Sequence, residues 1–149
     1  MKRVTGLGGV FFKAKDPEKL CAWYQRHLGL KREPHGTAVS FLWREVRGRG
    51  QGMTVWSLFP RNTRYFRPSR AHFMLNYRVR NLERLLKLLR RERVWIDSKR
   101  EDHEYGRFAW IMDPEGNRIE LWQPPAEKRA SRRPKPARKS RQTKRARAR

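Results

Sequence analysis

Glu120 is the acidic residue of this sequence whose surroundings most favour a chemical role. It lies in the run Ile119-Glu120-Leu121-Trp122, which is typical of a β-strand, and alternate side chains of a strand point to opposite faces. If Ile119 and Leu121 pack beneath helices, Glu120 and Trp122 face the other, concave side of the sheet. A carboxylate there is either held by Arg or His neighbours or contacts a ligand, and the sequence leaves both interpretations open.

Aromatic residues and one cation are the candidates for the walls of a binding cleft around Glu120. Aromatic walls with a positive charge suit planar or anionic small molecules. The candidates are Trp56, Tyr105, Arg107, Trp110 and Trp122. Large aromatic residues also fill the cores of sheets, and we expect Trp23 in the core and Trp122 in the cleft.

The other reactive side chains predict no site. His27, His35 and His103 stand at no recognisable spacing for metal ligands. Cys21 is the only cysteine, which excludes an intramolecular disulfide and a metal site built from several cysteines, and favours a reducing compartment. The first residues lack the apolar region of a secretion signal, and no stretch approaches the ~18 apolar residues that cross a bilayer. We therefore expect a soluble, cytoplasmic protein.

The first half of the sequence predicts one helix among strands. Val4–Ala14 is rich in Val and Phe and ends at Asp16-Pro17, where Asp16 would cap a helix that runs to Gly29. Further strands are expected at Lys31–Glu33, Thr37–Arg44 and Met53–Phe59, the last two as a hairpin around a turn rich in Arg and Gly.

The second half repeats this order of elements. After an Arg-rich loop over 60–70 comes a strand at Ala71–Val79, and an amphipathic helix follows, in which Leu82, Leu85, Leu86 and Leu89 recur at helical spacing. The last strands are expected at Arg93–Asp97, Arg107–Met112 and Asn117–Gln123. The order βαβββ thus occurs twice, and two such modules can form an open, curved barrel with a cleft. The predicted fold class is α+β, in one domain over residues 1–125.

Positive charge is the main compositional bias. Residues 126–149 contain twelve Lys or Arg and one acid, so eleven of the 24 net positive charges lie there and thirteen in residues 1–125. The C-terminal segment has no aromatic or large aliphatic residue, and we expect a disordered basic tail. Such a tail could contact nucleic acid or another polyanion without sequence preference, or it could be solvated without a partner.

Several motifs resemble the vicinal oxygen chelate superfamily, which includes glyoxalases, bleomycin resistance proteins and dioxygenases. The first strand and helix match in Gly8-Gly9-Val10-Phe11-Phe12, Asp16-Pro17 and Leu28-Gly29-Leu30. The closing hairpin matches in Tyr105-Gly106-Arg107-Phe108 and in the fairly specific run Asp113-Pro114-Glu115-Gly116-Asn117, followed by Ile119-Glu120-Leu121-Trp122. The resemblance covers residues 1–125 and implies the two-module fold, a cleft and a homodimer.

The resemblance also implies a position for a divalent metal. Four strands of the metal-dependent members supply ligands, and the matching positions here are Gly9, Ser57, His72 and Glu120. Only His72 and Glu120 are strong ligands, so a metal would rest on these two residues with Glu120 also catalytic, while Ser57 would be a ligand-binding residue.

Three functions therefore remain open. The first is binding of a small organic ligand in the cleft, which the positive charge of residues 1–125 suggests is anionic. The second is a metal-dependent lyase, isomerase or dioxygenase with a reduced metal site. The third is an interaction protein that binds polyanions or nucleic acid through its basic tail.

Overall fold

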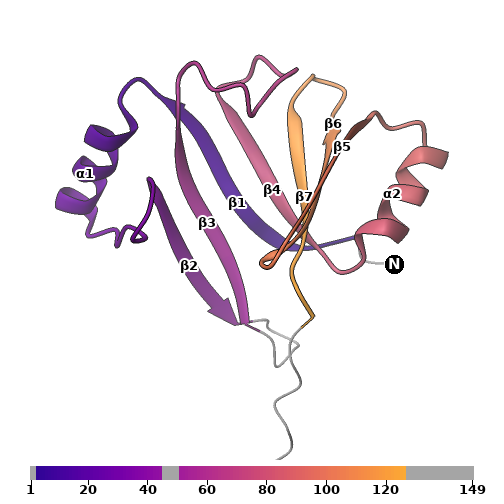
Figure 1. Ribbon diagram of the computed structural model, residues 1–149, viewed down its shortest axis with the longest axis horizontal. Helices are drawn as coiled ribbons and strands as arrows, with labels where there is room; N and C mark the ends of the chain where they lie inside the picture. The colour runs from indigo at the N-terminus through magenta and orange to yellow at the C-terminus, as the bar shows by residue number, and fades with distance from the viewer. Residues whose placement is uncertain (1–2, 45–50, 127–149) are drawn as a thin grey trace, which may run out of the picture.

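The computed structural model describes residues 3–44 and 51–126, and most of the predicted tail therefore lies outside the described residues. The elements, in chain order, are β1 (Val4–Ala14), α1 (Pro17–Leu28), β2 (Ala38–Arg44), β3 (Gln51–Pro60), β4 (Phe73–Val79), α2 (Leu82–Arg91), β5 (Ile96–His103), β6 (Gly106–Met112) and β7 (Arg118–Gln123). The strands form one sheet in the order β2-β3-β1-β4-β7-β6-β5. Figure 1 shows a curved, open sheet with α1 and α2 at its two ends.

The strand pairing confirms the predicted two-module plan, except that the first half is βαββ rather than βαβββ. In the first half β1 pairs parallel with β3, and β3 pairs antiparallel with β2. In the second half β4 pairs parallel with β7, and β7 pairs antiparallel with β6. An antiparallel pairing of β1 with β4 joins the two halves, so the centre of the sheet is a seam between them.

Both helices form where the sequence predicts them. The Asp16 side chain accepts a hydrogen bond from the Lys19 backbone N–H at 3.1 Å, and Gly29 ends α1 with a φ of 66°. The apolar face of α2 is buried against the sheet. Its members are Leu82, Leu85, Leu86 and Leu89, which pack with Val79, Ala109 and Leu121.

Two expectations for the first half are wrong. Trp23 is 51% exposed, because Cys21 is the buried residue of α1 and a residue two positions on lies about 200° around the helix. Lys31–Glu33 is not a strand, although the Glu33 backbone N–H donates to the Ala38 carbonyl at 2.8 Å. Pro34 follows this segment and removes a backbone donor, which limits further pairing.

The β5 strand lies later in the chain than predicted, at Ile96–His103 rather than Arg93–Asp97. It is almost entirely polar, so it lacks the apolar alternation by which strands are recognised. No helix among the described residues is long and apolar enough to span a bilayer.

Candidate functional site

A cavity of about 270 Å³ lies across the seam and is lined by residues of both halves. Most of its walls are apolar, from Gly8, Phe11, Met53, Val55, Tyr105, Phe108 and Trp122. Its polar lining residues are Tyr65, Asn76, Glu101, His103 and Glu120. A hollow of this kind, apolar with a few convergent polar groups, is typical of small-molecule sites.

Glu120 lies in the wall of this cavity, 2% exposed, where three side chains donate hydrogen bonds to it. The Tyr65 hydroxyl donates to Oε2, and the Trp110 indole N–H donates to the same oxygen at 3.0 Å. The Asn76 amide donates to Oε1 at 2.5 Å. The neighbours that hold this acid are therefore a phenol, an indole and an amide rather than the Arg or His that the sequence suggested.

Burial raises the pKa of Glu120, and the hydrogen bonds from Tyr65, Asn76 and Trp110 offset only part of that effect. The pKa of Tyr65 is raised as well, first by burial and then by the neighbouring Glu120 charge. Tyr65 therefore remains a protonated donor, while Glu120 retains its proton to a higher pH than an exposed glutamate does.

The raised pKa of Glu120 predicts how stability depends on pH. The folded protein holds a proton that the unfolded chain, with its ordinary value of 4.5, has already released. The stability contributed by Glu120 is therefore complete below about pH 4.5 and is lost as pH rises through the folded-state pKa. Denaturant unfolding of wild type and Glu120→Gln across this range should show the wild-type advantage shrinking as pH rises. An advantage that grows with pH would contradict the raised pKa.

Asn76 lines the cavity, and one buried polar atom of its side chain has no partner among the described residues. The side chain is 3% exposed, and its Oδ1 makes no hydrogen bond within the described residues. This oxygen lies against Gly8, where an added Cβ would be 2.1 Å away from it. A buried acceptor without a donor is costly, so a ligand N–H or O–H group that reached this oxygen would stabilise the complex.

The opposite wall is formed by the β5–β6 hairpin. His103 stacks on Tyr105 with ring centroids 4.9 Å apart, and Phe108 stacks on Trp122 at 6.4 Å with an interplanar angle of 12°. The Trp122 indole N–H donates to the Tyr105 carbonyl at 2.9 Å, which ties β7 to the hairpin turn. Glu101 contacts Lys99 at 2.5 Å and His103 at 3.1 Å, and these hydrogen bonds lower its pKa.

Several of the residues predicted from the sequence lie at this cavity, and others do not. Glu120, Trp122 and Tyr105 line it, and Trp110 contacts Glu120 without lining the cavity itself. Ile119 and Leu121 pack against α2, which explains why Glu120 and Trp122 face the concave side.

Trp56, Arg107 and Ser57 do not line the cavity. Trp56 packs on Tyr24 of α1, with ring centroids 4.8 Å apart, on the convex face. Arg107 is exposed and alternates with Phe108, which does line the cavity. Ser57 pairs with Phe11, two positions from the level of Glu120.

His72 is a correction to the predicted metal pair. It is exposed and precedes β4, and its carbonyl accepts from the Lys13 backbone N–H at 2.8 Å. The β4 residue paired with Glu120 is Asn76, four positions further on, which corresponds to roughly 13 Å along a strand. The structure therefore does not bring His72 to Glu120.

A row of four paired residues crosses the sheet at the level of Glu120. Val55 pairs with Gly9, Gly9 with Asn76, and Asn76 with Glu120. Glu120 and Asn76 are the members of this row whose side chains have oxygen or nitrogen atoms that could coordinate a metal. The Asn76 amide already donates a hydrogen bond to the Glu120 carboxylate. Among residues 3–44 and 51–126, no group of three or more His, Cys, Asp or Glu is placed to hold a metal ion. The residues present do not fit a chelated divalent metal.

The sequence matches the family model of the Glyoxalase/Bleomycin resistance protein/Dioxygenase superfamily over residues 6–121. The chain belongs to this superfamily. A search of the curated proteins found no match. Solved structures also resemble the fold, and three of them are described below.

The similar structures include two epimerases and a dioxygenase. One is a methylmalonyl-CoA epimerase from Streptomyces coelicolor in complex with 2-nitronate-propionyl-CoA, at TM-score 0.60 and 11% identity, covering 83% of this chain and 99% of that one. Another is methylmalonyl-CoA epimerase from Mycobacterium tuberculosis, at TM-score 0.52 and 22% identity, covering 85% and 92%. The third is the 2,3-dioxygenase LapB from a Pseudomonas species, at TM-score 0.50 and 14% identity, covering 80% and 42%. At these identities, the structural similarity supports the fold of this chain and does not extend to an activity.

Proposed function

We propose that this superfamily member binds a small, planar, neutral organic molecule in the cavity across the seam. The observation that carries the proposal is the pairing of an aromatic wall, formed by Trp122 and Phe108, with the unpartnered Asn76 Oδ1. A flat apolar body would stack on the wall, and an N–H or O–H group of the ligand would donate to Asn76 Oδ1.

The cavity lining favours a neutral ligand over the anionic one suggested by the net charge. Glu101, His103 and Glu120 are its ionisable groups apart from two tyrosines, and no Lys or Arg lines it. An anion would be placed beside two carboxyl groups without a cation of its own. A cation would compete with Lys99, which already contacts Glu101 at 2.5 Å.

A catalytic role of Glu120 is the second candidate function. Its raised pKa and its position in the cavity wall favour exchange of a proton with a bound molecule. This step would need no metal ligand at His72. A loss of turnover in Glu120→Gln that is clearly larger than its loss of ligand binding would support catalysis, whereas wild-type binding without any chemical change in the ligand supports the first candidate. The homodimer expected from the family resemblance remains a prediction.

Binding of 2-quinolone tests the proposed function. This neutral, planar lactam carries one N–H donor, and we expect it to raise the melting temperature and to quench tryptophan fluorescence. Its N-methyl derivative should bind more weakly because it lacks the donor, and 2-naphthoate should bind more weakly because it is anionic. Stronger binding of 2-naphthoate than of 2-quinolone would overturn the neutral-ligand assignment.

Two tryptophan variants localise this binding. Trp122→Ala removes the stacking wall and should weaken 2-quinolone binding about tenfold or more. Trp95→Ala is the matched control, since Trp95 is 47% exposed and does not line the cavity. Equal affinities of the two variants would show that the molecule binds elsewhere.

A further inference from the structure

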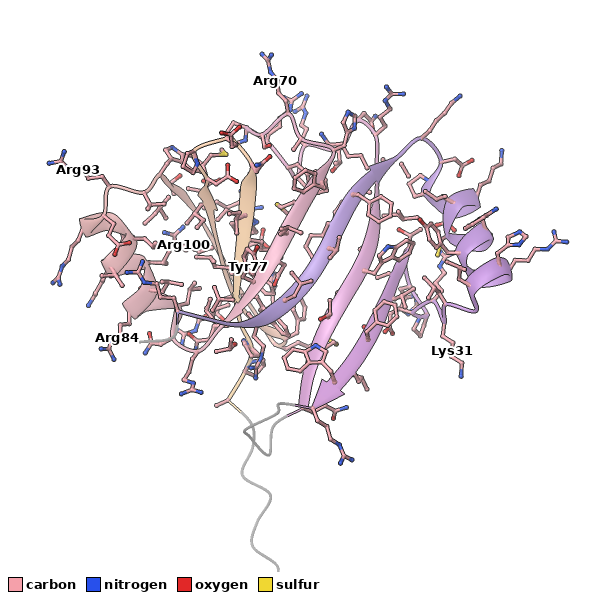
Figure 2. All side chains as sticks on the ribbon, turned by 180° about the vertical axis from the view of Figure 1, so that it is seen from behind. Lys31, Arg70, Tyr77, Arg84, Arg93 and Arg100 are labelled. Atoms are coloured by element: carbon pink, nitrogen blue, oxygen red, sulfur yellow. The ribbon has the colours of Figure 1, made fainter. Side chains whose placement is uncertain are left out.

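A second, separate pocket of about 560 Å³ lies on the segment between β3 and β4. Cations line it, from Lys13 at the end of β1 and from Arg61, Arg67 and Arg70 of the connecting segment. The remaining lining residues are Asn62, Thr63, Pro68 and Ser69, so no acid is among them. Figure 2 shows Arg70 extending from this edge of the sheet, away from the strands.

The cations of this pocket carry no carboxylate partner within the described residues, unlike other basic residues of the protein. Arg3 pairs with Glu92 at 2.5 Å and Arg32 with Glu18 at 2.6 Å, but no such ion pair holds Arg61, Arg67 or Arg70. Lys13 lies over the ring of Phe66, 5.3 Å from its centroid. Four positively charged side chains thus line one hollow that no acid lines, and their mutual repulsion favours an anion there.

Two hydroxyl groups in the pocket wall retain a free hydrogen. Ser69 is only 6% exposed, and its Oγ accepts the Ala71 backbone N–H at 3.2 Å. The Thr63 Oγ accepts the Tyr65 backbone N–H at 3.2 Å. Because both oxygens act as acceptors in these contacts, their hydrogens remain available to an acceptor in the pocket.

The segment that carries these groups is held in place from inside. Phe66 is fully buried among Phe11, Met74 and Trp110. The Arg118 guanidinium donates to the Arg67 carbonyl, and backbone turns join Thr63 to Pro60 at 2.9 Å and Arg67 to Arg64 at 3.0 Å. The backbone that presents the cations is therefore organised before any ligand arrives, which lowers the entropic cost of binding.

We propose that this pocket binds a phosphate group. Arginine forks and hydroxyl donors match the oxygens of phosphate, and several cations around one hollow suit a group with more than one negative charge. The group is carried either by a small phosphorylated compound or by a nucleic-acid backbone. This site shares no lining residue with the apolar cavity.

Titration of the full-length protein with inorganic pyrophosphate, at fixed ionic strength, tests this site. The triple variant Arg61→Gln, Arg67→Gln, Arg70→Gln removes three exposed cations and should weaken binding at least about tenfold. The matched control is Arg84→Gln, Lys87→Gln, Arg91→Gln, which removes the same charge from the wet face of α2. Figure 2 shows Arg84 far from Arg70. The control should retain wild-type affinity.

A short single-stranded DNA oligonucleotide, titrated in parallel at several salt concentrations, distinguishes the two sources of phosphate. We call the triple variant of Arg61, Arg67 and Arg70 the loop variant. If it weakens DNA binding more than the control does, and if DNA binding also becomes less dependent on salt, the source is a nucleic-acid backbone. If only pyrophosphate binding falls, the source is a small phosphorylated compound. Equal affinities of the loop variant and the control for both probes, or no wild-type binding of either probe, would overturn the proposal. Melting temperatures of both variants check that each remains folded.

Discussion

Replacement of Glu120 by alanine should lower the free energy of unfolding by about 3 kcal/mol or more, measured by urea denaturation. The Tyr65 hydroxyl, the Asn76 amide and the Trp110 indole all donate to this one carboxyl group. Alanine would leave three donors without their acceptor, each at a cost of about 1 kcal/mol or more. The effect should be large because the group and its donors lie within the protein rather than on its surface.

Glu120→Gln is the control that separates hydrogen bonding from loss of the carboxyl group itself. The NH2 group of the new glutamine would face the Asn76 Nδ2, which is also a donor. A flip of the Asn76 amide would turn the unpartnered Oδ1 toward that NH2 group and restore a hydrogen bond. We expect this variant to lose less than half as much stability as Glu120→Ala. Equal losses in the two variants would show that the hydrogen bonds around Glu120 contribute little.

Gly106→Ala should destabilise the protein by about 3 kcal/mol through backbone strain and a steric clash. Gly106 begins β6 with a φ of 133°, which side chains rarely tolerate. An added Cβ would lie 2.4 Å from the Gln123 carbonyl oxygen and 2.5 Å from the Trp122 Nε1. Relief of that contact requires the hairpin to move away from β7, so the aromatic wall of the cavity should open as well.

Gly116→Ala is the matched control for this substitution. Gly116 also has a positive φ, of 76°, but nothing lies within 4 Å of its added Cβ. This variant should lose only about 1 kcal/mol, the cost of the backbone conformation. Thermal unfolding of both variants measures the difference in stability. If Gly116→Ala lost as much stability as Gly106→Ala, the steric clash beside Trp122 would contribute nothing to the effect.

The elements that the sequence predicts well are those with a local signal. Asp16 and Gly29 mark the ends of α1 by cap chemistry, and the spacing of four leucines defines the buried face of α2. The predicted position of β5 is wrong because this strand lies at the edge of the sheet and has polar side chains on both faces, which leaves no apolar alternation to mark it. The tendency of large aromatic residues to fill cores also placed Trp23 there wrongly, because its helix buries only Cys21.

The site was harder to predict because it depends on strand register and on a loop. Alternation along β7 correctly directs Glu120 and Trp122 to the concave face. Alternation cannot distinguish His72 from Asn76, because it assigns residues four positions apart to the same face, and only the pairing of β4 with β7 selects Asn76. A polar Asn inside the apolar run Phe73-Met74-Leu75-Asn76-Tyr77 was a usable signal. Tyr65 reaches Glu120 from the segment between β3 and β4, where no periodicity exists to indicate its direction.

The row of Val55, Gly9, Asn76 and Glu120 shows how the two halves divide the work at the cavity. The seam relates its inner members, Gly9 and Asn76, and its outer members, Val55 and Glu120, as counterparts in the duplicated halves. The first-half pair has no polar side-chain atom, whereas the second-half pair is an amide and an acid. Hydrogen-bonding chemistry at this level of the sheet therefore comes from the second half, and the first half supplies an apolar wall through Val55.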